Sequence, residues 1–173
     1  MLRLALSLLL LASCRPKRDL SQYVEEDPRS KLSPTLALGN PLTEGQLKSG
    51  FHQVEEGRWR WTASHFSVEL KAPFASQQRG ATLTLKGNLP EMLIAKSGPI
   101  VVSAQLNKTA LPPMTFAQAG EVLYQADVAA ASLLAGPVIV TFTVDKFLPP
   151  NTIPGDGREL ALIVSSIALE TKK

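Results

Sequence analysis

Two tryptophans in one short segment are the side chains of this sequence best suited to contact a ligand. Trp59 and Trp61 alternate with Arg58 and Arg60, and Glu55 lies just before them. If the segment is a strand, both indole rings face the same side of it. A flat aromatic face can stack on the apolar surface of a sugar ring, while guanidinium and carboxylate groups beside it hydrogen-bond hydroxyls. The pattern therefore predicts a sugar-contacting surface.

A place in the hydrophobic core is the alternative for the same rings. Only 6% of the residues are aromatic, and a small domain needs large apolar side chains inside, which favours buried tryptophans with Arg58 and Arg60 in solvent. An exposed Tyr124 beside either tryptophan would favour the sugar-contacting surface instead. The candidate ligand-binding residues are Trp59, Trp61, Arg58, Arg60, Glu55 and Tyr124.

Catalytic and metal-binding motifs are lacking in the sequence. His52 and His65 flank the tryptophan segment, but no HExxH-like spacing joins them to Glu55 or Glu56. No Gly-x-Ser-x-Gly elbow, Ser-His-Asp order or phosphate loop is present. A glycosidase would need two carboxylates at a defined separation, for which the candidates are Glu55, Glu56, Asp127, Asp145 and Asp156. We expect no enzyme, no metal site and no cofactor.

The first residues form a secretory leader that ends at the only cysteine. One Arg near the start is followed by an apolar run and small residues over positions 1–13, which is typical of a signal peptide and too short to span a bilayer. Leu11, Ala12, Ser13 and Cys14 look like the lipobox of bacterial lipoproteins, in which the thiol is lipidated and the chain is cut before it. Lipidation also explains a lone cysteine in an exported protein, because it can form no internal disulfide.

The charge of the chain excludes a nucleic-acid partner. Removal of residues 1–13 takes away one Arg, so that a net charge of 18 − 15 = +3 becomes 17 − 15 = +2, too small an excess to draw phosphates. Residues 14–35 carry prolines and scattered charges with little apolar periodicity, which predicts a lipidated, flexible tether. By resemblance to sorted lipoproteins, Arg15 after the cysteine favours the outer membrane over the inner one in a host that has both.

Residues 36–173 are expected to form one all-β domain. Short alternating runs separated by Gly, Pro and Asn predict about eight strands, two of them over Trp59–Trp61 and Phe66–Leu70. Asn107 and Lys108 are typical of a hairpin turn. At most one short helix is expected, over 129–134. The expected architecture is an antiparallel β-sandwich of the jelly-roll kind, with an ion pair of Asp156 and Arg158 bracing the last loop.

Three segments together resemble the β-sandwich module appended to bacterial glycosyltransferases and polysaccharide-synthesis proteins. The segments are 50–62, which contains the two tryptophans, 102–107, and 147–161, in which Ala161 stands where that module often has Gly. The resemblance spans about residues 45–170 through short motifs. It implies a carbohydrate-binding-like sandwich, here on a lipid anchor without the transferase.

Two functions follow as expectations. The first is a non-catalytic, membrane-anchored lipoprotein of the cell envelope whose sandwich binds a glycan or envelope polymer. The second is a protein-interaction or structural subunit of an envelope assembly. The expected partners are the lipid anchor and a glycan or an envelope protein.

Overall fold

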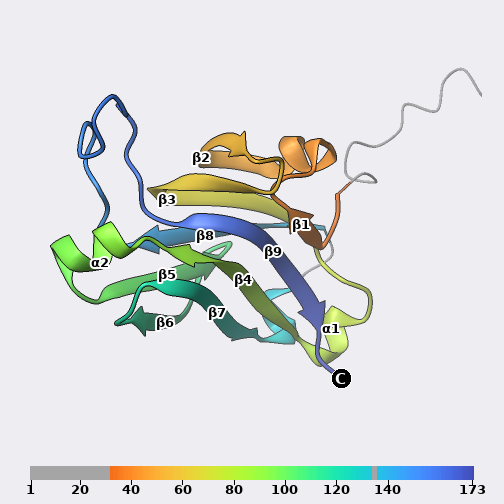
Figure 1. The fold of residues 1–173 in the computed structure, drawn as a ribbon. Coiled ribbons are helices and arrows are strands. Elements are labelled where there is room, and N and C mark those ends of the chain that lie inside the picture. Colours follow the sequence, from red (N-terminus) through yellow and green to blue (C-terminus); the bar gives the residue numbers. More distant parts are fainter. Residues whose placement is uncertain (1–31, 134–135) are drawn as a thin grey trace, which may run out of the picture.

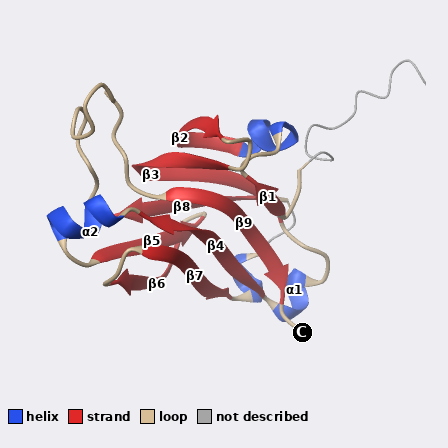
Figure 2. Cartoon of the chain, in the orientation of Figure 1, coloured by secondary structure: helices blue, strands red, loops and turns tan. Residues whose placement is uncertain are grey.

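The computed structural model describes residues 32–133 and 136–173 of the chain. Its strands are β1 (Thr35–Ala37), β2 (Leu47–Glu55), β3 (Trp59–Lys71), β4 (Ala81–Leu89), β5 (Ile100–Leu106), β6 (Thr109–Phe116), β7 (Gly120–Val128), β8 (Pro137–Val144) and β9 (Ile163–Thr171). All the strand pairs are antiparallel. The predicted all-β class is confirmed, and Figure 2 shows how strands dominate the described chain.

The strands form an antiparallel β-sandwich made from one continuous sheet. The hydrogen-bonded order is β6-β5-β8-β3-β9-β4-β7, with β2 on β3 and β1 on β9. One half of β3 pairs with β8, whereas its start pairs with β9, so β3 passes from one layer to the other. The layers lie face to face in Figure 1, with β9, β4 and β7 in front and β8 and β5 behind.

The tryptophan strand is longer than the sequence pattern suggested. Two separate strands were expected over Trp59–Trp61 and Phe66–Leu70, but β3 runs through both without a break. The residues between them, Thr62 to His65, contain no Gly, Pro or Asn that would form a turn. This continuity settles which side chains face the core, because a strand alternates sides at every residue.

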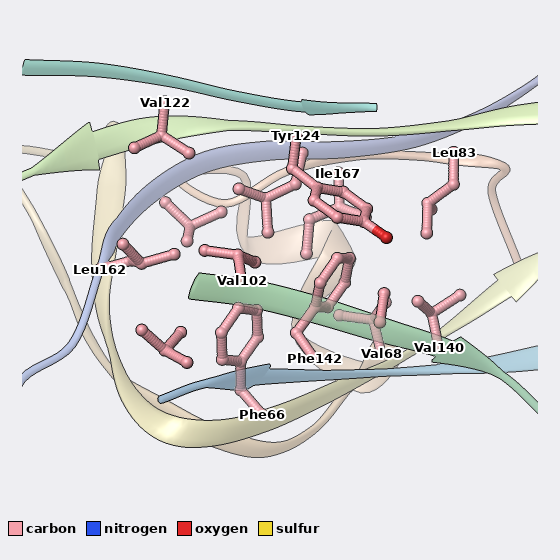
Figure 3. Packing of buried hydrophobic residues seen from close by; sticks show 14 of the residues in the cluster. Phe66, Val68, Leu83, Val102, Val122, Tyr124, Val140, Phe142, Leu162 and Ile167 are labelled. Carbon is pink, nitrogen blue, oxygen red and sulfur yellow. The ribbon is translucent and has the colours of Figure 1, made fainter. Parts of the chain in front are cut away.

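Aromatic rings and branched aliphatic side chains from both layers fill the core. Phe66 stacks on Phe142 with ring centroids 5.0 Å apart, and Tyr124 meets Phe142 edge-on at 6.0 Å. Figure 3 shows the Tyr124 ring projecting from the opposite layer toward Phe142. Val68 and Val140, paired across β3 and β8, are completely buried. Burial of such side chains is the main source of stability in a domain of this size.

Short helical segments connect the strands, more of them than the one expected. Helix α1 covers Ser76–Arg79 and α2 covers Glu91–Ser97; 3-10 turns cover Pro41–Gln46 (η3) and Ala130–Ser132 (η4). The last lies within the expected helical segment over 129–134, part of which falls outside the described residues. No helix in 32–133 or 136–173 is long and apolar enough to cross a membrane.

The two ends of the sandwich differ in what they carry. The long connection from β8 to β9, residues 145–162, lies at one end with the β2–β3 turn, since Arg158 bonds Glu55 there. At the other end the described chain enters, because the Ser33 carbonyl accepts from the amide of Lys71, and α1 and the chain's C-terminal residues lie there too (Figure 1). We call the first end distal and the second tether-proximal, after the tether that the sequence predicts over residues 14–35.

Candidate functional site

Both tryptophans lie on the outer surface of the sandwich, at the distal end. Trp59 and Trp61 occupy the face of β3 opposite Phe66, and each is half-buried. Neither belongs to the buried core, although Trp61 packs against its rim. The core position that the composition favoured is therefore approached by Trp61, which packs against the core cluster, but not by Trp59. Partly buried rings held on a strand are restrained and keep part of their surface in solvent.

A charged network braces the distal end beside these rings. Glu55 pairs with Trp59 across the β2–β3 turn, and its Oε1 accepts a 2.8 Å hydrogen bond from Nη1 of Arg158. The same guanidinium donates to both oxygens of Asp156 at 2.8 and 2.9 Å, so the expected loop ion pair is found and extends to Glu55. Bonds from the side chain and the amide of Arg158 lower the pKa of Asp156 to about 2. The three charges therefore fix the 145–162 loop on the β2–β3 turn.

A second carboxylate ties the same loop to the middle of β3. Glu159 Oε1 accepts from the amide of Ser64 at 2.6 Å, and its own carbonyl accepts from Nε2 of His52 at 2.7 Å. The bond from Ser64 lowers the pKa of Glu159. His52 and His65 thus hold positions in or beside structural hydrogen bonds. Among residues 32–133 and 136–173, no three His, Cys, Asp or Glu side chains are grouped so as to hold a metal ion.

The sequence pattern predicted that Arg60 points into solvent, but in the structure it does not. It lies on the inward face of β3 and is only 7% exposed. Its Nε donates to the Leu38 carbonyl and its Nη1 to the His52 carbonyl, both at 3.0 Å, and Nη2 pairs with Glu44. Because every side of the guanidinium is occupied, Arg60 is a structural clamp between β1, η3 and β2. Arg60 is therefore no longer a ligand-binding candidate.

A small open hollow lies over this clamp. It has a volume of about 120 Å³ and is lined by Glu44, Leu47, Lys48, Ser49, Gly50, Phe51 and Arg60. The indoles of Trp59 and Trp61 are on the opposite face of β3 and do not line it. The hollow and the tryptophan surface are therefore separate features.

Tyr124 is a core residue and not part of the distal surface. Its side chain is completely buried. The hydroxyl donates to the Pro112 carbonyl at 2.9 Å, which ties β6 to β7, and burial raises the pKa of Tyr124 to about 12. The sequence showed only an alternating strand here, which does not say which face of the strand is covered. Tyr124 is therefore removed from the candidates.

Arg58 keeps its predicted place in solvent. It belongs to the β2–β3 turn and pairs with Glu56 at 2.5 Å, where both side chains are mostly exposed. The bond from Arg58 lowers the pKa of Glu56. Arg58 and Glu55 are thus the two charged candidates that stand beside the tryptophans.

Polar side chains cover the outer face of β3, β8 and β5 next to the tryptophan end. Paired residues across the three strands form one row of His65, Thr143 and Ser103 and another of Ser67, Thr141 and Gln105. Ser49 of β2 extends the second row and shares a 2.7 Å hydrogen bond with Ser67. The alternation of threonine with valine and phenylalanine in β8 indicates an outward polar face. It does not indicate which strands lie beside β8. These rows supply hydroxyl, amide and imidazole groups to a surface ligand.

The lipidation candidate, Cys14, lies outside the described residues, as do the leader over 1–13 and most of the tether over 14–35. The expectations made for them are not addressed by the fold.

Comparison with known proteins gives only distant similarities of shape. No family model matches the chain, and no curated protein matches it. A family 36 carbohydrate-binding module of a multidomain xylanase, from the hindgut metagenome of Trinervitermes trinervoides, has 10% identity and a TM-score of 0.42, covering 76% of this chain and 94% of its own. A family 36 module in complex with calcium and xylotriose has 9% identity and a TM-score of 0.42, covering 79% and 98%.

An enzyme of the rumen bacterium Butyrivibrio proteoclasticus, an acetyl xylan esterase, is also similar in part. It has 9% identity and a TM-score of 0.44 over 80% of this chain, but over only 33% of the esterase. At these identities and TM-scores the likeness is one of β-sandwich outline and extends neither to a ligand nor to an activity.

Proposed function

We propose that this chain is a non-catalytic, lipid-anchored protein of the cell envelope whose sandwich binds a glycan or envelope polymer at its distal end. One observation carries the binding proposal. Trp59 and Trp61 are partly buried and lie on the outward face of β3, at the opposite end of that strand from Lys71, beside which the described chain begins. The part of each indole that stays in water gains no stability from burial, so a ligand-contacting role would explain why such large rings lie on the outward face.

Stacking and polar contacts would act together at this surface. Residues on one face of a strand repeat at about 6.7 Å, so the two indoles offer adjacent platforms for neighbouring sugar rings. Arg58 lies at one side of them in solvent. The polar rows that begin at His65 continue along β3 and supply hydrogen-bonding groups to sugars farther along an extended chain. The braced 145–162 loop keeps the platform rigid, which lowers the entropy lost on binding.

The state of the nearby carboxylates supports a binding role over a catalytic one. A general acid for glycoside cleavage needs a carboxyl group whose pKa is raised. Asp156 and Glu159 instead have lowered pKa values because each accepts hydrogen bonds from Arg158 or Ser64. Glu55 is occupied by the same guanidinium. Asp156 and Glu159 therefore favour the charged form, which suits bracing and hydrogen bonding.

The lipid anchor is proposed from the leader and Cys14. A diacylglyceryl group on the thiol would supply two acyl chains that hold the protein at the bilayer, since each buried CH₂ contributes about 0.8 kcal/mol. Arg15 favours the outer membrane in a host with two membranes. Replacement Cys14→Ser is expected to give an unprocessed or soluble chain. Membrane fractionation with globomycin treatment tests this: normal membrane recovery and globomycin-insensitive processing of the variant would contradict the anchor.

A glycan-array screen with the detergent-solubilised full chain tests the binding proposal. We expect selective binding that weakens roughly tenfold in Trp59→Ala and in Trp61→Ala, the loss of one stacking contact each. Phe74→Ala is the matched control, because Phe74 is an exposed aromatic at the tether-proximal end. Thermal unfolding establishes that each variant is folded. Absence of binding by folded wild type would favour the protein-interaction function, which pull-downs from envelope extracts would then pursue.

A further inference from the structure

The tether-proximal end carries an exposed aromatic residue that the proposed glycan site does not use. Phe74, in the connection from β3 to α1, is 96% exposed. Its carbonyl accepts a 2.7 Å hydrogen bond from the Thr171 hydroxyl, which fixes the loop against the end of β9. A phenylalanine ring standing almost entirely in water loses the favourable burial of its apolar surface. Its backbone is nevertheless held, so the ring is presented by the fold.

The backbone beside this ring is strained. Ala75 adopts φ 60° and ψ 7°, the left-handed region that favours glycine. The turn directs the chain from β3 into α1 and leaves the Phe74 side chain outside. Two unfavourable features in adjacent residues, an exposed ring and a left-handed alanine, are typical of a segment retained for contact with something else.

Positive charge surrounds the same loop. Lys71, Arg79 and Lys173 are exposed around it, and Lys172 pairs with Asp127 at 2.8 Å. Two acidic side chains lie nearby, Asp127, which is the partner of Lys172, and Glu170 on β9. Four basic residues therefore face two acidic ones, and an anionic surface is the complementary partner.

The position of the tether points to the bilayer as that surface. The amide of Lys71 donates to the Ser33 carbonyl at 3.1 Å, so the described chain begins beside Lys71, which is three residues before Phe74 in sequence. From Cys14 to Ser33 there are 33 − 14 = 19 residues, which reach at most about 65 Å. This end of the sandwich therefore lies within about 65 Å of any membrane that carries the anchor, and it is closer to the anchor along the chain than the distal end is.

We propose that Phe74 and the basic residues around it form a membrane-contacting patch, in which the ring enters the headgroup region of an anionic bilayer while Lys71, Arg79 and Lys173 face the lipid phosphates. This rests on the proposed lipid anchor. Contact through this end turns the distal end away from the bilayer. β3 has 13 residues, which at a rise of about 3.3 Å amounts to about 40 Å of strand. The tryptophans would stand out from the membrane by a distance of that order.

Quenching by spin-labelled lipid tests the patch in the full, membrane-extracted chain reconstituted in vesicles containing phosphatidylglycerol. An environment-sensitive thiol dye is placed by Gln77→Cys on α1 and, as the matched control, by Gln53→Cys at the distal end; both glutamines are exposed. We expect strong quenching at position 77 and little at position 53. Adding Phe74→Ser to Gln77→Cys is expected to reduce the quenching several-fold, and salt is expected to weaken it. Equal quenching at both positions, or no effect of Phe74→Ser, would overturn the proposal.

Failure of the anchor would give a different result in the same experiment. A lipidated Cys14 cannot take the dye, so each variant should bind one dye and the unmodified parent chain none. Labelling of the parent would show a free Cys14 and contradict the anchor. The patch would still be tested, because the parent signal can be subtracted and stronger quenching at position 77 than at position 53 on added vesicles would still show contact through this end.

Discussion

The two halves of β3 share one backbone conformation but present opposite chemistry to the inside of the sandwich. From Phe66 to Leu70 the inward side chains are apolar and completely buried. From Arg60 to Ser64 they are polar, and two of the three bond directly to the main chain around them. An apolar half gains stability from area and tolerates some repacking, whereas a polar half depends on particular donors and acceptors. The strand thus joins a stabilising half to a positioning half that carries the tryptophans.

The largest expected effect is on the stabilising half. Phe66→Ala removes a ring that stacks on Phe142 and touches Phe51 edge-on, so the free energy of unfolding should fall by about 3–5 kcal/mol. Urea denaturation measures the change. His65→Ala, the neighbouring exposed residue, is the control and should shift stability by less than about 0.5 kcal/mol. A similar loss in both variants would mean that this half is not the main apolar core.

A smaller loss is expected when the clamp in the positioning half is removed. Arg60→Ala leaves the Leu38 and His52 carbonyls without their side-chain donor, which costs about 1–3 kcal/mol. Arg60→Lys should recover only part of it, because an ammonium group cannot replace the planar guanidinium fork. Urea denaturation ranks the three chains, and a variant Arg60→Ala as stable as wild type would show that the clamp contributes nothing.

The halves also show what sequence reasoning could reach. Alternation correctly marked the apolar half and the polar face of β8, and the Asn107-Lys108 pair correctly marked the turn between β5 and β6, where Asn107 adopts φ 54°. Alternation did not show that the two segments of β3 are one strand. Without that continuity, the side of the sheet on which Trp61 and Arg60 lie could not be assigned. A buried arginine is against the ordinary rule for charged residues, so only its partners, distant in sequence, reveal it.

Local signals for the short helices were present but weak. Helix α2 is preceded by Pro90, has Glu91 in its first turn and Lys96 in its last, and ends before Gly98. That pattern agrees with known helix boundaries, yet seven residues are too few for apolar periodicity to be distinguished from a loop. The hydrogen bond from Arg158 to Glu55 likewise joins residues that are far apart in sequence, so the local sequence pattern does not predict it.

Acid should weaken the positioning half before the stabilising half. The folded pKa of Asp156 is lowered to about 2, below its ordinary value near 4, so its ion pair stabilises the fold above that ordinary value and is lost as the pH falls toward 2. Asp156→Asn should therefore be less stable than wild type at pH 7, and the difference should close between about pH 4 and 2. Urea denaturation across this range measures it. A difference independent of pH would assign the effect to packing instead of charge.

The smallest effect is expected two residues from the clamp. Arg58 and Arg60 are the same residue type on one segment, yet Arg58 pairs with Glu56 in solvent whereas Arg60 is buried. Exposed ion pairs contribute little because water and salt screen them, so Arg58→Ala should leave the free energy of unfolding unchanged within error while Arg60→Ala lowers it. If Arg58→Ala nevertheless weakens glycan binding, Arg58 contacts the ligand; equal destabilisation by both variants would remove the distinction between the turn and the inward face of β3.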